Sequence, residues 1–256
     1  MGALGAGRVA RAADDAMSEW TLVQHMHTRH SFDSLSEPRW LVERAEELGI
    51  DVIAVTDHGT WKGAVEAREC AREAGLKLHV IQAAEYLTDH GDVIGLFLDR
   101  ELEVPSAPRL CDAIHEHGGL TLLPHPYRWH KLDEDLLSRI DLIEVYNSRT
   151  SQADNERAVE LARARRRPGL AGPDAHRIGE LSLARNLFDG ERPAEDEGLK
   201  HALLHAPRRF EIAAGSEWDE WISQGVKLVR RPSVRGALRL ARGAARRILK
   251  RPDPEP

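Results

Sequence analysis

The sequence predicts an α/β protein whose strands are mainly parallel and buried, arranged as a β/α barrel or as an open sheet. Short apolar runs alternate along the chain with segments of helical periodicity, and the runs are apolar throughout. Such runs are typical of parallel strands that helices cover on both faces. The 256 residues are enough for one large domain with a substantial core.

The expected elements follow one another without an internal repeat. Apolar runs predict strands, in chain order, at residues 20–24, 50–57, 78–86, 93–98, 120–126, 140–147 and 169–176. Apolar residues at helical spacing predict helices at residues 38–49, 64–75, 107–119 and 152–166. Pro38 near the start of the first helix and glycines at the ends of the first two support these boundaries.

Composition excludes several classes of protein. The two cysteines, Cys70 and Cys111, are not in CxxC spacing, which argues against a disulfide framework and favours a reducing cytoplasm. No apolar run reaches the roughly 20 residues that span a bilayer, and the N-terminus lacks the apolar stretch of a secretion signal. We therefore expect a cytoplasmic protein with a disordered extension at residues 1–19 and one domain at residues 20–215.

Residues 216–256 are expected to form a basic amphipathic segment. The chain has a net charge of −6, yet residues 226–256 carry ten Lys and Arg against Asp253 and Glu255. Apolar residues recur there at helical spacing, so the segment suits an anionic membrane surface or a nucleic acid. The alternative, which we favour, is a helix that packs on the domain, because its alanine-rich stripe offers little area for membrane insertion.

Nine metal-binding side chains lie next to expected strands. They are His25, His27, Asp33, His58, Glu85, Asp92, His125, Asp174 and His176. The carboxyl ends of parallel barrel strands open onto one face, so these residues are expected to converge there. His25 and His27 are two residues apart, and an extended strand would point both the same way as a chelating pair.

This set favours two or three divalent metal ions. One cation takes about four to six ligands, and a mixed nitrogen and oxygen set without thiolates suits manganese, iron or zinc. Each motif alone has an ordinary explanation, since DHG (57–59) is typical of a turn and DAH (174–176) of a helix cap. The repeated placement at strand ends is what favours a metal centre.

The ordered motifs resemble the polymerase and histidinol phosphatase (PHP) family of metal-dependent phosphoesterases. They are HMHTRHSFDS, VTDHG, AAEY, GDVIGLFL, LLPHP, EVYNS and GPDAH, between His25 and His176. The resemblance implies a distorted (β/α)7 barrel of the PHP type. It also implies that one metal is bound by His25, His27, Glu85 and Asp174, a second by Glu85, Asp92 and His125, and a third by Asp33, His58 and His176.

The expected activity is hydrolysis of a phosphomonoester or nucleotide phosphate by metal-activated hydroxide. Asp57 is expected to orient a ligand histidine, and His58 and His176 are candidates for protonating the leaving oxygen, with a metal-bound water as the alternative. Arginines that follow strand-end motifs, Arg128, Arg149 and Arg177, are candidates for binding the substrate phosphate.

Two other functions are compatible with the pattern. A metal-dependent amidohydrolase also uses HxH on its first strand, but its usual strand-end lysine is replaced here by Glu85. A non-catalytic metal-binding accessory module, recruited by the basic segment, is the other alternative, although a nearly complete ligand set argues against lost catalysis. The sequence leaves open which phosphorylated small molecule or nucleotide is the substrate.

Overall fold

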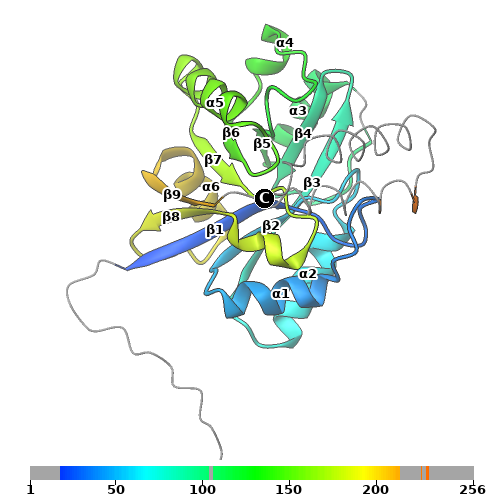
Figure 1. Ribbon diagram of the computed structural model, residues 1–256, viewed down its shortest axis with the longest axis vertical. Helices are drawn as coiled ribbons and strands as arrows, with labels where there is room; N and C mark the ends of the chain where they lie inside the picture. The colour runs from blue at the N-terminus through cyan, green and yellow to red at the C-terminus, as the bar shows by residue number, and fades with distance from the viewer. Residues whose placement is uncertain (1–17, 104–105, 214–225, 227–228, 231–256) are drawn as a thin grey trace, which may run out of the picture.

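The computed structural model describes residues 18–103, 106–213, 226 and 229–230. They form a mixed α/β fold whose sheet curls into a nearly closed barrel, as the sequence predicts (Figure 1). The strands of this part are β1 (Glu19–Met26), β2 (Val52–Val55), β3 (His79–Thr88), β4 (Gly91–Leu96), β5 (Leu120–Leu123), β6 (Leu142–Asn147), β7 (Gly169–Gly172), β8 (Ala184–Asp189) and β9 (Arg208–Ile212). The helices are α1 (Pro38–Glu47), α2 (Lys62–Glu73), α3 (Ala107–Glu116), α4 (Glu134–Leu137), α5 (Gln152–Arg165), α6 (Asp196–His205) and the 3₁₀ helix η1 (Ile178–Ser182).

The sheet is only partly parallel. Its strand order is β7-β6-β5-β4-β3-β2-β1-β8-β9, with parallel pairs in β1-β2-β3 and in β5-β6-β7. Strand β4 runs antiparallel to both neighbours, which corrects the expectation for residues 93–98. The reason is the connection: only Asp89 and His90 separate β3 from β4, and a parallel crossover needs a dozen residues or more. Gly91, with a φ of +106°, completes this hairpin turn.

The barrel is nearly closed at a seam between β1 and the segment that follows β7. The backbone amide of His27 donates to Ala175 O at 2.7 Å, and the amide of Ala175 donates to His25 O at 3.1 Å. Deeper in the seam, the buried side chain of Asn186 bonds both the amide and the carbonyl of Ala171, and it donates to Leu22 O. The Asn186 side chain of β8 therefore connects β7 to β8 and β1, although no ladder in the described sheet pairs β7 with either of these strands.

Apolar side chains pack on both faces of the barrel wall. Inward-facing residues such as Leu22, Ile81 and Leu142 form an interior cluster, which Leu199 and Leu203 of α6 also join. Two outer clusters lie under the helices: α1 and α2 cover β1–β3, and α3, α4 and α5 cover β4–β6 (Figure 1). This burial explains why the strand sequences are apolar throughout.

Helix α6 lies at the amino-terminal end of the parallel strands. His79, the first residue of β3, contacts Asp196 at the start of α6 through atoms 2.8 Å apart. Elements α4, η1, β8, α6 and β9 were not expected from the sequence, because they are short or lack a clear period. Residues 1–17, 214–225, 227–228 and 231–256 lie outside the described residues, so the predicted extension and the basic segment stay predictions. Within the described ranges, no helix combines the length and apolar character needed to cross a membrane.

Candidate metal centre

All nine predicted metal-binding residues lie at one rim of the barrel. Strand β1 and its following loop supply His25, His27 and Asp33, and the other strand ends supply the rest. The antiparallel direction of β4 places its amino-terminal end at this rim, which is why Asp92 lies at the start of its strand, whereas His25 and His27 lie at the carboxyl end of β1. A cavity opens here, lined by Asp33, His58, Glu85, Asp92, His125, Arg128, Trp129, Arg149, Asp174 and His176.

Three of these residues have a strained backbone conformation that directs their side chains toward the centre. His25, His125 and Asp174 have φ values of +64°, +29° and +49°, in the left-handed region that costs ordinary residues about 1–3 kcal/mol. His25 also lies at a β-bulge, where the pairing of β1 with β2 shifts register. The predicted convergence of His25 and His27 is therefore observed, but a bulge produces it and not the regular alternation of an extended strand.

Glu85 lies at the middle of the centre. Its carboxylate is 1% exposed, and oxygens of this group lie 3.5 Å from Nε2 of both His25 and His27. The same carboxylate lies 3.2 Å from His58 Nδ1 and 3.3 Å from His125 Nε2. Burial disfavours the charged carboxylate, but the surrounding histidines outweigh this effect and hold the pKa of Glu85 well below its usual value. A single carboxylate thus faces ligand atoms from four directions.

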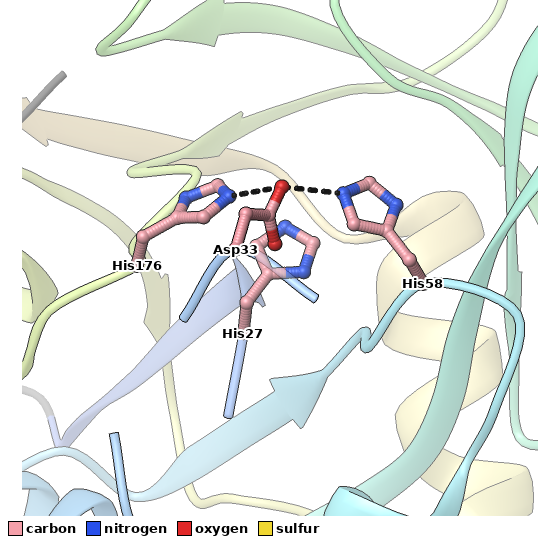
Figure 2. Close-up of side chains that lie close together, drawn as sticks. All are labelled: His27, Asp33, His58 and His176. Atoms are coloured by element: carbon pink, nitrogen blue, oxygen red, sulfur yellow. Dashed lines mark ion pairs between the residues drawn. The ribbon is translucent and has the colours of Figure 1, made fainter. Parts of the chain in front are cut away.

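Asp33 bridges the opposite wall of the centre. Its Oδ2 lies 3.2 Å from His58 Nε2 and 3.3 Å from His176 Nε2, and the ring of His27 lies between them (Figure 2). Asp33 comes from an irregular loop, whereas the histidines come from the ends of strands or the turns after them. Burial would raise the pKa of Asp33, but His176 and His58 outweigh burial and lower it.

Asp174 joins the two walls. Its Oδ1 lies 3.5 Å from His25 Nε2, 3.4 Å from His27 Nε2 and 3.4 Å from His176 Nδ1. Ligand atoms fall into three overlapping groups: His27, Asp33, His58 and His176; His25, His27 and Asp174; and His25, Glu85 and His125. Asp92 lines the same cavity, where burial and the charge of Glu85 raise its pKa to about 6.

Unsatisfied atoms in this cluster fit divalent cations. Within the described part of the chain, His25 Nε2, both ring nitrogens of His27, both oxygens of Glu85 and His125 Nδ1 are buried without a hydrogen-bond partner. Such atoms cost free energy unless something binds them. Four carboxylates and five histidines converge in one place, and cations would satisfy both the lone pairs and the excess negative charge.

Sequence reasoning missed Glu144, which orders much of the centre. Its buried Oε1 accepts from His25 Nδ1 at 2.8 Å and from Gln24 Nε2 at 3.0 Å. Its Oε2 accepts from the His125 amide and from Asn147 Nδ2, both at 2.8 Å. A carboxylate on Nδ1 holds a proton there and orients Nε2 of His25 toward Glu85 and Asp174. The available signal was a lone acid inside the apolar run LIEVY.

Asp57 does not line the cavity. Its fully buried carboxylate accepts from the Thr28 amide at 2.6 Å and from the Thr28 hydroxyl at 2.7 Å. Burial raises the pKa of Asp57, although the Thr28 donors oppose the shift. The structure therefore corrects the expectation that Asp57 orients a ligand histidine: Glu144 does so, and Asp57 fixes the start of the loop that carries Asp33.

The three predicted phosphate-binding arginines lie in different settings. Arg128 lines the cavity, with Nη1 3.7 Å from Asp174 Oδ2 and its guanidinium over the Trp129 ring. Arg149 also lines the cavity, but it donates to Asp174 O and to the buried carboxylate of Glu180 at 2.7 Å each. Arg177 is exposed and is not among the lining residues of the described cavity. Of the three, Arg128 and Arg149 line the described cavity, and Arg149 also contacts a buried acid.

Glu180 is a second acid that sequence reasoning missed. Its Oε2 accepts from the amides of His176 and Arg177 at 2.7 and 2.9 Å, while Oε1 contacts Arg149. The Arg149–Glu180 pair is almost fully buried and holds the segment between Asp174 and η1. Arg149 is therefore part of the support under Asp174 and His176.

Comparison with known proteins identifies the family to which this chain belongs. The PHP domain model matches residues 24–164, more than half of the chain, and the PHP-associated model matches residues 152–203. The chain belongs to the PHP domain family, as the motifs predicted. Membership, together with the His, Asp and Glu groups described above, supports a metal-dependent hydrolase.

Individual relatives are of several kinds. An uncharacterised protein of Methanocaldococcus jannaschii is 36% identical over 138 residues, which are 48% of this chain and 80% of that protein. The 5'-3' exoribonuclease Rnm of Salmonella typhimurium is 38% identical over 79 residues, 29% of this chain and 27% of the exoribonuclease. A two-domain protein from Bacteroides vulgatus, described as containing a predicted PHP-like metal-dependent phosphoesterase, superposes with a TM-score of 0.65 at 17% identity. That superposition covers 82% of this chain and 70% of the other, and it shows the shared fold.

Proposed function

We propose that this protein is a metal-dependent phosphoesterase that hydrolyses a phosphomonoester or a nucleotide phosphate. The observation that carries the proposal is the buried Glu85 carboxylate, which faces four histidines while neither of its oxygens has a hydrogen-bond partner among the described residues. Structural carboxylates are hydrogen-bonded when buried, whereas a carboxylate that bridges cations needs both oxygens free for them.

The chain's own residues would divide the work as follows. His25, His27, Glu85 and Asp174 would hold one cation, Glu85 with Asp92 and His125 a second, and Asp33 with His58 and His176 a third. When bound, such cations activate water at neutral pH and neutralise charge on the phosphoryl group. A mixed nitrogen and oxygen set favours manganese, iron or zinc.

Arg128 would bind the substrate phosphate at the mouth of the cavity. Arg128 lines the cavity, and its Nη1 lies 3.7 Å from Asp174 Oδ2. This distance is longer than that of a close ion pair. A phosphate oxygen that entered the cavity would meet this guanidinium, and arginine binds phosphate in a bidentate fashion. His58 and His176 border the same space, so whichever of them does not hold a cation could supply the proton for the leaving oxygen.

Phosphate release by the purified protein with manganese tests the proposal. The panel would hold small phosphomonoesters, nucleoside monophosphates, 3',5'-bisphosphates and short oligonucleotides, each with and without chelator. We expect His25→Ala to lose more activity than the roughly 10–100-fold that is typical when only a ligand's supporting partner is removed. His117→Ala removes a partly exposed histidine of the helix side and should keep full activity. Bound manganese without release from any phosphoester would refute the proposal.

Arg128→Ala separates substrate binding from metal binding. We expect a higher KM and an unchanged manganese content, because Arg128 lines the cavity and its Nη1 lies 3.7 Å from Asp174 Oδ2, beyond hydrogen-bond distance. A loss of manganese in this variant would contradict the assignment of Arg128 to phosphate.

A further inference from the structure

We propose that Arg230 is a positioning residue of the metal centre, which holds the loop that carries Asp33 in its ligand-binding conformation. The inference rests on the proposed function, because it assigns Asp33 to a metal group. Arg230 lies nearly 200 residues away in sequence from that loop, in a part of the chain for which neither the motifs nor the nine predicted ligands indicate any role at the site.

The contact is made by one nitrogen and three carbonyl groups. Arg230 Nη1 lies 3.0 Å from Arg29 O, 2.8 Å from Ser31 O and 3.0 Å from Ser34 O. Three carbonyl oxygens that converge on one point repel one another unless a donor or a cation lies between them. The guanidinium supplies both, so this curved conformation of the loop depends on the arginine from outside the barrel.

Other contacts hold the loop near its two ends, where Arg29 and His30 contact Glu66 and the Ser36 hydroxyl donates to His176 O. The loop contains no helix or strand between β1 and α1, and its internal bonds include Arg29 N to Ser36 O at 2.8 Å. Ser34 anchors its far side, donating to His27 O and His176 O. Between these points, the bond from Ser31 Oγ to Asp33 Oδ1 at 3.0 Å fixes the carboxylate.

Ser31 connects Arg230 to the metal group. Its carbonyl accepts from Arg230, while its hydroxyl donates to Asp33 and accepts from the His58 amide at 3.3 Å. A shift of Ser31 would therefore move a ligand carboxylate and the backbone of a ligand histidine together. Arg230 contacts neither the substrate cavity nor a ligand side chain in the described structure, so its effect would pass through the loop.

The experiment compares the full-length protein with Arg230→Ala, Arg230→Lys and Arg72→Ala. Arg72→Ala is the matched control, because it removes the same charge from an exposed position on α2. Two quantities are measured: amide hydrogen exchange in metal-free protein, and the affinity of each bound manganese by titration. Circular dichroism and urea unfolding establish that the variants are folded.

We expect Arg230→Ala to accelerate exchange of the amides of residues 29–36 by about tenfold or more, with α2 and β3 unchanged, since the loop opens locally. One bound manganese ion, the one that Asp33 is proposed to hold, should lose about tenfold in affinity, and the others should keep theirs. Arg230→Lys should recover part of both effects, because an ammonium keeps the charge but not the planar donor geometry. Arg72→Ala should match the wild type.

The outcomes are distinguishable. Unchanged loop exchange in Arg230→Ala would overturn the contact itself, and faster exchange with unchanged affinity for every manganese would overturn the positioning role. Failure of the wild type to bind any divalent metal would refute the proposed function. The exchange measurement on metal-free protein would still show whether Arg230 holds the loop in that case.

Discussion

Replacing Glu144 by glutamine tests the support under the metal centre with almost no change in volume. The wild-type carboxylate accepts four hydrogen bonds, two on each oxygen, and its side chain is buried. A glutamine amide accepts on one end only. Whichever way it turns, its NH₂ group meets two donors, so two of the four hydrogen bonds are lost.

The local geometry indicates which way the amide turns. Gln24 Oε1 has no hydrogen-bond partner among the described residues, so Gln24 can rotate by half a turn and accept from a new NH₂ group. The favoured arrangement therefore puts the NH₂ at the Oε1 side and keeps the bonds to His125 and Asn147. His25 Nδ1 then loses its acceptor, which costs about 1–3 kcal/mol for a buried donor. The alternative orientation would leave two donors unsatisfied, or about 2–6 kcal/mol.

The same change reaches the metal through His25. Without a carboxylate on Nδ1, the proton is no longer held there, and a proton on Nε2 would block the nitrogen that faces Glu85 and Asp174. We expect Glu144→Gln to lower manganese affinity by about 10–100-fold. Urea unfolding of metal-free protein and manganese titration measure the two effects. Glu47→Gln, an exposed control, should change stability by less than about 0.5 kcal/mol. Wild-type affinity and stability in Glu144→Gln would refute this account.

Two further predictions concern packing and pH. A methyl group at Gly172 would lie 2.0 Å from Glu144 Oε1, so Gly172→Ala should lower the free energy of unfolding by about 1–3 kcal/mol or more, measured by thermal unfolding. The control Gly179→Ala, which has open space around the added methyl group, should be nearly neutral. His115 Nε2 bonds Asp141 at 2.8 Å; this carboxylate raises the pKa of His115, and although burial opposes it, bonding to His115 lowers the pKa of Asp141. The stability that this pair contributes is fully present between about pH 4 and 6.5. It is lost as pH falls through the lowered pKa of Asp141 and as pH rises through the raised pKa of His115. Urea unfolding of Asp141→Asn, measured against pH, should show no such window, and an unchanged profile would contradict the assignment.

The fold class was predictable because a strand that is buried on both faces of a sheet has apolar residues throughout its length. Each strand between helices is apolar throughout, and the structure shows clusters on both sides of the wall. The direction of β4 was missed, although the connection at Asp89 and His90 is too short for a parallel crossover. Strand β9 has no such apolar run, because it is largely exposed and lies at the sheet edge. Strand β8 (Ala184–Asp189) is mostly buried, but Arg185 and Asn186 interrupt its apolar run.

The position of the site was predictable for a similar reason, since strand ends in a barrel must meet. The structure brings all nine predicted ligands to one rim, and their assignment to metals stays a prediction. The supports were not predictable from spacing. Glu144 and Glu180 act across distances of 119 and 31 residues, on His25 and Arg149 respectively, and nothing local in the sequence connects these partners. Arg149 follows a strand-end motif like Arg128 does, yet only the fold shows that it meets a buried acid.

The left-handed backbone at His25, His125 and Asp174 has a consequence for directed evolution. Glycine adopts these φ values without penalty, so replacing any of the three by glycine would relieve about 1–3 kcal/mol of strain in the metal-free chain, against the packing that the side chain provides. A library screened only for resistance to heat, without metal, would gain part of its stability at the positions that form the centre. Screening in the presence of manganese would reverse that preference, because metal binding to the intact ligands would stabilise the folded protein.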